Sequence, residues 1–79
     1  MNHTLKCKSE YFQATKSGLK MFEVRRNDRN FEGGDTILLL EIDGDLETGE
    51  RLHLKIIYFL RGGIYGISDD YCVLGLTKV

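Results

Sequence analysis

The stretch RLHLKIIYFL, residues 51–60, decides the fold class of this chain. Apolar or aromatic side chains occupy every second position of it: Leu52, Leu54, Ile56, Tyr58 and Leu60. This two-residue period is that of a β-strand with one face turned toward a core. The stretch is longer than most strands, which predicts that it bends around a small barrel.

Two segments nearer the amino terminus have the same period. In residues 3–8, HTLKCK, the side chains of His3, Leu5 and Cys7 alternate with threonine or lysine. Residues 20–26, KMFEVRR, alternate between apolar and charged side chains over part of their length. Both segments are therefore predicted to be strands, and the second has one apolar face and one charged face.

Two further strands follow. Residues 36–43, TILLLEID, form an almost unbroken apolar run, which predicts burial on both faces of the strand. Residues 44–50, GDLETGE, have the composition of a hairpin connection. Residues 61–70, RGGIYGISDD, are predicted to be a loop, and residues 71–76, YCVLGL, a fifth strand that closes the sheet.

One short helix separates the first two strands. It is predicted over residues 10–17, with Ser9 as its N-cap and Gly18 as the left-handed residue that ends it. Two helical turns are marginal alone, so packing of Tyr11 and Phe12 must hold them. The predicted order is β-α-β-β-β-β. The fold class is α+β, mainly β: a small five-stranded barrel with one short helix that plugs an opening.

Length and composition indicate a single domain over residues 1–79. With 42% hydrophobic residues and 4 Tyr plus 4 Phe, the chain can build one core. No apolar run approaches the roughly 18 residues of a membrane span. The segment MNHTLKCK lacks the apolar part of a signal peptide. We therefore expect a cytoplasmic protein without a membrane partner, either a monomer or a weak homodimer.

The cysteines and histidines offer zinc ligands but not in zinc spacing. Cys7 and Cys72 lie near opposite ends of the chain, and two such residues without a secretion signal are typically reduced core thiols. Together with His3 and His53 they form no closely spaced pair of the C-x-x-C kind. We expect no metal site and no cofactor.

The net charge of −1 hides a strong segregation of charge. Residues 1–29 carry seven Lys or Arg and three acids, a balance of +4. Residues 30–50 carry seven acids and no base, and residues 51–79 carry four bases and two acids, which returns the total to −1. This distribution argues against a general nucleic-acid coat and leaves room for a local anion-binding surface in the first third of the chain.

That first third contains the candidate site. Glu23 and Arg25 share one face of a predicted strand, about 7 Å apart, where they can flank a small planar ligand. Lys20 has the opposite parity and joins them only if the chain is still turning after Gly18. Arg29 extends the basic track, and guanidinium groups present a planar fork to phosphate oxygens. The sequence also allows a simpler interpretation, a solvated strand face with surface ion pairs.

Other motifs are weaker indications of chemistry. Tyr11, Tyr65 and Tyr71 can stack on bases, or pack in the core or at its rim. The glycine-rich GGIYG, residues 62–66, is followed by a strand rather than by the helix that a phosphate-binding loop requires. The sequence has no visible serine, histidine and acid triad.

The stretch SGLKMFEVR resembles the signature of the ASCH domain, a branch of the PUA-like superfamily. The matching positions are Gly18, Lys20, Glu23 and Arg25, followed by a later Gly-Asp pair that opens a strand, Gly34 and Asp35. Residues 5–76 also resemble a small ASCH-like family of bacterial and phage proteins. The shared features are YF in the helix, FE-x-R-x-ND on the strand, YG late in the chain and VLGL near its end.

The resemblance implies a β-barrel with a cleft beside the helix, lined by the lysine, the glutamate and the arginine, and a role in RNA or nucleotide binding. One ASCH branch is an amidohydrolase that acts on acetylated cytidine through the lysine, a threonine and a distant glutamate. Glu23 stands in the place of that threonine here, and we find no match for the distant glutamate.

We therefore expect a module that binds RNA or a nucleotide through Lys20, Glu23, Arg25 and Arg29. Asn27 and Asp28 are expected to shape the turn. The alternatives are a small amidohydrolase on a modified nucleoside, with Lys20 and Glu23 as its catalytic candidates, and a protein-interaction module with an exposed apolar patch and no basic cleft.

Overall fold

The computed structural model describes residues 1–79 and confirms the predicted order of one helix and five strands. The helix α1 follows the first strand directly and precedes all the others. The elements are β1 (Asn2–Lys8), α1 (Ser9–Lys16), β2 (Phe22–Arg26), β3 (Thr36–Asp43), β4 (Leu46–Arg61) and β5 (Tyr71–Lys78).

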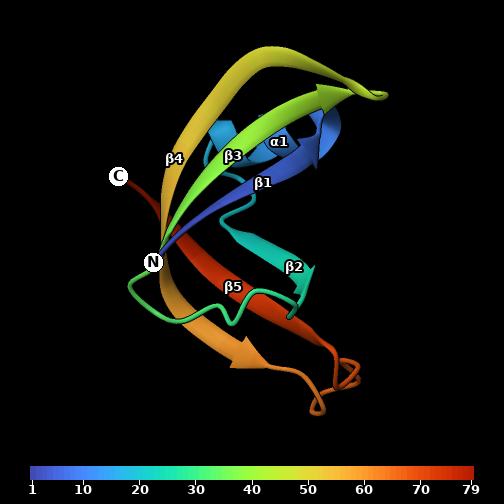
Figure 1. The fold of residues 1–79 in the computed structure, drawn as a ribbon, viewed down its shortest axis with the longest axis vertical. Coiled ribbons are helices and arrows are strands. Elements are labelled where there is room, and N and C mark those ends of the chain that lie inside the picture. Colours follow the sequence, from blue (N-terminus) through green and yellow to red (C-terminus); the bar gives the residue numbers. More distant parts are fainter.

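The five strands form one curled sheet with the order β1-β3-β4-β5-β2. β1 pairs with β3 in parallel, and every other pair is antiparallel. In Figure 1, β4 curves along one side of the molecule, with β1 and β3 above and β2 and β5 below. β1 and β2 are the two edges of the sheet and do not pair with each other. The result is a half-barrel, and we call the unpaired junction between β1 and β2 the seam.

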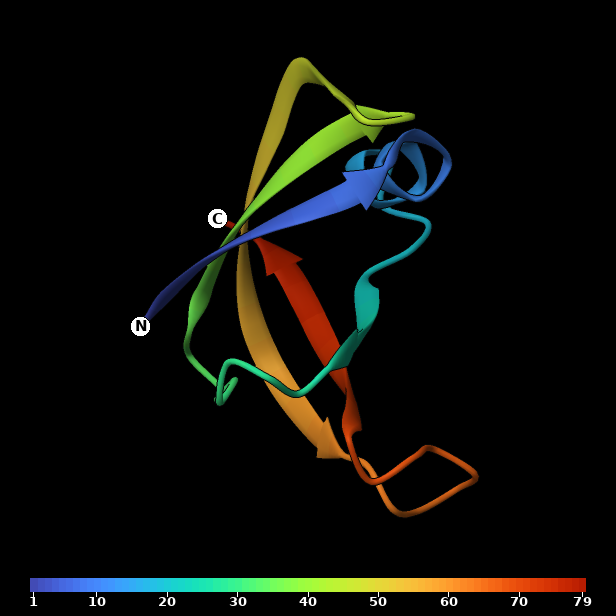
Figure 2. The same ribbon diagram turned by 45° about the vertical axis from the view of Figure 1, so that its right-hand side comes forward.

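The helix covers one end of the half-barrel. It contacts β3 and β1, and Figure 2 shows it beside the end of β1. Phe12 and Thr15 are fully buried there, so the helix plugs the opening as expected. Gly18 ends the helical segment with a φ of +87°, as predicted. Ser9 is not the N-cap: the cap position is Lys8, and the Ser9 hydroxyl instead donates to Glu41, 2.8 Å away.

The long stretch is a strand, as predicted, but its first residue and part of its alternation differ from the prediction. β4 begins at Leu46, so the hairpin is tighter than the seven-residue connection that we expected. Its alternation breaks at a bulge between Ile56 and Tyr58. Because an extra residue reverses the parity of a strand, Tyr58 is 65% exposed, while Phe59 packs against the core. The prediction that Tyr58 shares a face with the buried Ile56 was therefore wrong.

The core is a single cluster between the curled sheet and the helix. β3 buries only one of its faces, which corrects the prediction of burial on both. Cys7 and Cys72 are free and buried, in agreement with their interpretation as core thiols. No helix has both the length and the apolar character required to cross a membrane. The cluster contains Leu5, Cys7, Phe12, Phe31, Ile37, Leu39, Leu54, Ile56, Cys72, Leu74 and Leu76.

Two buried carboxylates connect distant parts of this framework. Asp35, just before β3, accepts hydrogen bonds from His3 Nε2 at 2.8 Å and from the backbone nitrogen of Glu32 at 3.0 Å. The bond from His3 is the main reason that the pKa of Asp35 falls from 3.8 to about 2. The aspartate of the Gly-Asp pair therefore connects β1 to the loop before β3, and it does not face the seam.

Glu41 has a comparable role under the helix. Its carboxylate accepts from Ser9 and Gln13 of α1, both at 2.8 Å, and from Thr48 of β4 at 2.5 Å. The hydrogen bonds from these neutral donors lower the pKa of Glu41, and the bond from Gln13 has the largest effect. It joins β3, α1 and β4 without any cation among its hydrogen-bond donors.

Candidate functional site

The seam is bridged by arginine side chains instead of backbone hydrogen bonds. Arg25 Nη2 donates to the backbone oxygen of Lys6 at 2.7 Å, and Arg29 Nη1 donates to that of Thr4 at 2.8 Å. Edge strands present unpaired carbonyl groups, and here guanidinium groups satisfy two of them. The junction is therefore polar and lies open to solvent where a closed barrel would have a backbone ladder.

β2 turns its charged face inward. Phe22 and Val24 are 45% and 53% exposed, whereas Glu23 between them is only 4% exposed. This is the reverse of the usual arrangement, in which the apolar face of a strand covers the core. The apolar alternation therefore correctly predicts a strand, but the residues that face inward are those of the candidate site.

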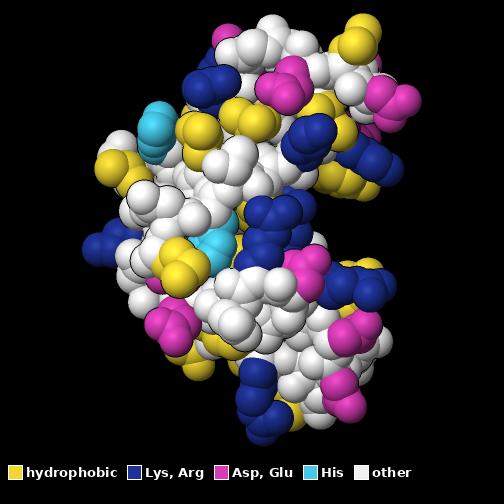
Figure 3. Space-filling view, viewed as in Figure 1, with side chains coloured by type: hydrophobic (Ala, Val, Ile, Leu, Met, Phe, Trp, Pro, Cys, Tyr) yellow, Lys and Arg dark blue, Asp and Glu magenta, His cyan; other side chains and the backbone are white.

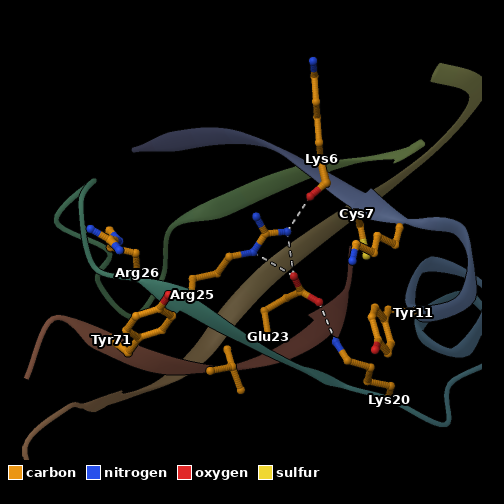
Figure 4. A pocket seen from close by; sticks show the side chains of 10 residues that line it. Lys6, Cys7, Tyr11, Lys20, Glu23, Arg25, Arg26 and Tyr71 are labelled. Atoms are coloured by element: carbon orange, nitrogen blue, oxygen red, sulfur yellow. Dashed lines mark hydrogen bonds and ion pairs between the residues drawn. The ribbon is translucent and has the colours of Figure 1, made fainter. Parts of the chain in front are cut away.

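Glu23 is held between two cations. Its Oε2 lies 2.6 Å from Lys20 Nζ, and its Oε1 lies 2.9 Å from Arg25 Nε and 2.8 Å from Arg25 Nη2. A buried carboxylate without such partners is strongly unfavourable. The structure thus brings Lys20, Glu23 and Arg25 together, as Figure 4 shows.

Lys20 reaches this group because it lies outside the strand. β2 begins only at Phe22, and the chain is still turning after Gly18, so the parity of Lys20 along the sequence does not apply. Its Nζ also donates to the backbone oxygen of Phe22 at 2.7 Å. The ammonium group lies 4.9 Å from the centre of the Phe22 ring and 5.9 Å from that of Tyr11. These contacts fix the ammonium group beside the glutamate.

A cavity of about 470 Å³, the seam cavity, opens over this group. Figure 3 shows the hollow on the right of the molecule, with Lys and Arg side chains on both sides of it. Five of the lining side chains are basic and one is acidic, a balance of +4. The lining residues are Lys6, Cys7, Lys8, Tyr11, Lys20, Glu23, Val24, Arg25, Arg26 and Tyr71.

Several of these cations have donors to spare. Arg25 uses Nε and Nη2, which leaves Nη1 without a partner, and the side chains of Lys6 and Lys8 make no hydrogen bond or ion pair. Arg26 lies over the Tyr71 ring at 5.7 Å and makes no ion pair. The Lys6 side chain points away from Glu23 (Figure 4), so it contributes charge at the rim. The cavity is therefore suited to an anion.

Cys7 lies in the wall of the seam cavity. Burial raises the pKa of its thiol, and the nearby Glu23 raises it further, while Lys20 and Arg25 lower it. Because the net shift is upward, the group is a neutral thiol at pH 7. It contributes packing to the cavity rather than a nucleophile.

Arg29 is not part of this cavity. It lines a smaller hollow of about 110 Å³ beside it, which we call the arginine cavity. The prediction that Arg29 extends the basic track stays a prediction, but its side chain does not meet Lys20 or Glu23. The arginine cavity is lined by Leu5, Arg25, Arg26, Asp28, Arg29 and Phe31.

The family model described as "Domain of unknown function (DUF3850)" matches residues 2–76, almost the whole chain. The chain belongs to the DUF3850 family. This membership fits the expected small family of phage and bacterial proteins. An uncharacterised 12.9 kDa protein in the GpA 3′ region of Escherichia phage P2 is 37% identical over 54 residues. That match covers 68% of this chain and 50% of the relative, so the chain spans about half the length of the curated relative that it matches.

The DUF3850 chain also has a counterpart among solved structures. The crystal structure of the hypothetical protein PH0355 superposes with a TM-score of 0.69 and covers 100% of both chains. The sequence identity is 16%, so this likeness shows the fold alone.

Sequence reasoning missed two of the lysines around the seam cavity of this DUF3850 protein. Lys6 and Lys8 line its rim from β1. The signal was present in the alternation of HTLKCK, which places both lysines on the outer face of the first strand. That the edge of β1 lies beside β2 depends on the curl of the whole sheet, which the alternation does not specify.

Proposed function

We propose that this DUF3850 protein is an ASCH-like module of the PUA-like superfamily that binds RNA or a nucleotide in the seam cavity. The observation that supports the proposal is the convergence of Lys20, Glu23 and Arg25 in a hollow of net positive charge. These are the signature positions of the ASCH resemblance. They meet at one buried carboxylate, with a basic rim around them.

The chemistry of each group suggests its role. Arg25 has a free Nη1, which can donate to a phosphate or to a base carbonyl. A carboxylate has about four acceptor positions. The cations make two hydrogen bonds to Glu23 and one further ion-pair contact, so an oxygen can still accept from a base N–H. Lys20 supplies positive charge next to that acceptor. A group of one acceptor and two cationic donors matches the mixed donor and acceptor edge of a base, while the unpaired cations around the cavity match its phosphate.

Aromatic side chains line the same cavity. Tyr11 is 47% exposed and stands beside Lys20, and Tyr71 lies under Arg26. Sequence-specific recognition of RNA commonly stacks an unpaired base on such rings. A volume of about 470 Å³ falls within the range of small-ligand sites. The seam cavity thus has room for one nucleotide and a ring surface on which its base can stack.

A fluorescence titration against short RNAs and the nucleoside 5′-monophosphates tests the proposal. Affinity should fall as salt rises, because phosphate contacts release counterions. Lys20→Ala and Arg25→Ala should each weaken binding about ten-fold or more while the fold survives. Arg51→Ala is the matched control, since Arg51 is exposed on β4 and lines none of the cavities. Binding that ignores salt, or equal affinity in all three variants, would contradict the proposal.

Incubation with acetylated cytidine is the second arm of this test. Glu23 occupies the position at which the amidohydrolase branch has a threonine, so binding without turnover is the expected result. Turnover that disappears in Lys20→Ala would replace the binding role with hydrolysis. Turnover that persists in that variant would point to a contaminating enzyme and leave the binding role as proposed.

A further inference from the structure

The arginine cavity adjoins the seam cavity through shared side chains. Arg25 and Arg26 line both hollows. A ligand that contacts these two arginines from the seam cavity therefore lies next to the arginine cavity. The two hollows are neighbours, with Arg25 and Arg26 at the boundary between them.

The charge of the arginine cavity is also positive. It is lined by three arginines and one acid, a balance of +2. The acid, Asp28, lies 3.8 Å from Arg29 Nε and its side chain is 61% exposed, so it offsets the positive charge only in part. Arg29 donates a hydrogen bond from Nη1 to the Thr4 carbonyl, and its Nη2 makes no hydrogen bond. Guanidinium groups with unused donors thus line the hollow together with the buried Leu5 and Phe31.

The size of the arginine cavity limits what it can hold. Its volume of about 110 Å³ lies below the range of about 300–1,000 Å³ that is usual for whole-ligand sites. The arginine cavity by itself therefore holds at most a part of a ligand. A single phosphate group fits the volume, and its charge matches the three guanidinium groups.

We infer that the arginine cavity takes a second phosphate of the ligand whose first part occupies the seam cavity, an inference that rests on the proposed function. The ligand then carries at least two phosphates. A nucleoside diphosphate and a 5′-phosphorylated dinucleotide both satisfy this requirement. Arg25 and Arg26 lie between the two phosphates, and Arg29 contacts only the second.

Titrations of each nucleoside 5′-monophosphate, its 5′-diphosphate and the matching 5′-phosphorylated dinucleotide test this inference. The parent protein should bind one of the two bis-phosphate ligands about ten-fold more tightly than the monophosphate. For the dinucleotide, the slope of log affinity against log salt should be steeper by about 0.7 for the added phosphate. The ligand that binds more tightly than the monophosphate shows whether the second phosphate comes from a diphosphate or from the next nucleotide of a chain.

Two variants assign the gain to the arginine cavity. Arg29→Ala should reduce the ratio of bis-phosphate to monophosphate affinity below about threefold. Asp28→Asn should raise the ratio, because it removes the carboxylate that repels the second phosphate. Arg51→Ala should leave the ratio unchanged, and thermal melting checks that each variant is folded. An effect in opposite directions at neighbouring positions 28 and 29 cannot come from a general loss of structure.

The outcomes separate this inference from the proposed function. Equal affinity for mono- and bis-phosphate ligands in the parent would overturn the inference, while the Lys20-dependent binding of the monophosphate stands. A gain that persists in Arg29→Ala would also overturn it. If no nucleotide or RNA binds at all, the proposed function fails, and the inference fails with it.

Discussion

The seam and the helix end of the half-barrel each bury one glutamate, and the two carboxylates are stabilised in different ways. Glu23 and Glu41 are both 4% exposed. Glu23 is held by two cations, Lys20 and Arg25, whereas Glu41 is held by hydroxyl and amide groups. The neutral donors of Glu41 connect three elements and line none of the cavities. The cations of Glu23 line a cavity, and an incoming anion can compete for them.

This difference separates a structural carboxylate from a candidate binding one. Equal burial does not distinguish them, because both are satisfied by hydrogen bonds. The charge of the partners does, since only the seam keeps an excess of positive charge after its acid is paired. The predictions below test that distinction through stability, in order of decreasing effect.

The largest effect is expected from Glu23→Ala. The change leaves the Lys20 and Arg25 side chains, which are 20% and 25% exposed, without a counter-charge. We expect a loss of about 1–3 kcal/mol, because each cation retains some access to water. Thermal melting measures it, at about 4–8 °C for each kcal/mol in a domain of this size. Added phosphate should restore part of the melting temperature, since the anion can take the place of the carboxylate.

Glu41→Ala should lower the melting temperature by less, because its orphaned partners are neutral. Phosphate should give no recovery beyond that seen in the parent protein. Hydrogen exchange should become faster in α1, since Ser9 and Gln13 lose their connection to β3. Recovery of Glu41→Ala by phosphate to the same extent as Glu23→Ala would remove the distinction between the two sites.

The third prediction concerns acid stability. The pKa of Asp35 is lowered to about 2 from 3.8, and the pKa of Glu41 is lowered too. A lowered carboxyl pKa adds stability that is fully present above the unfolded value and is lost as the pH falls toward the folded one. The melting temperature should therefore decline between about pH 4 and pH 2. Asp35→Asn should melt lower at pH 7 and show a flatter decline, and an equally steep decline in this variant would contradict the assignment.

The smallest stability effect is expected at the seam bridges. Arg29→Lys removes a guanidinium bond to the Thr4 carbonyl from a side chain that is 48% exposed. Partly exposed polar contacts of this kind contribute about 0–1 kcal/mol. Melting should change little, while amide exchange in β1 near Thr4 should rise. A large loss of stability would mean that the contacts across the seam hold the sheet together, and not the backbone hydrogen bonds that pair β4 with β3 and β5.

Much of the fold follows from local patterns in the sequence. Alternation identified the strands around Leu5, Val24 and Leu54, and Gly18 marked the end of the helical segment. The prediction was wrong where a tertiary contact replaced an expected local hydrogen bond, or where a single extra residue shifted the alternation of a strand. The bulge before Tyr58 reversed the strand face, and an extra residue of this kind leaves no mark in the hydrophobic alternation.

The candidate site was predictable in part. Glu23 and Arg25 were placed on one face from their spacing, and the inward turn of that face required the curled sheet. Ser9 has the residue type of an N-cap. Its hydroxyl nevertheless donates a hydrogen bond to Glu41, which lies 32 positions away in the sequence. A partner at that separation is set by the pairing of β1 with β3, and so no local pattern reveals it.

The arginine bridges across the seam have one more consequence. An uncovered edge strand can pair with a strand of another molecule, and this is a common route to aggregation. In this half-barrel, Arg25 and Arg29 occupy the carbonyl groups of Lys6 and Thr4 that such a strand would need. The arginines that line the two cavities thus also shield the open edge of the sheet from pairing with another copy of the chain.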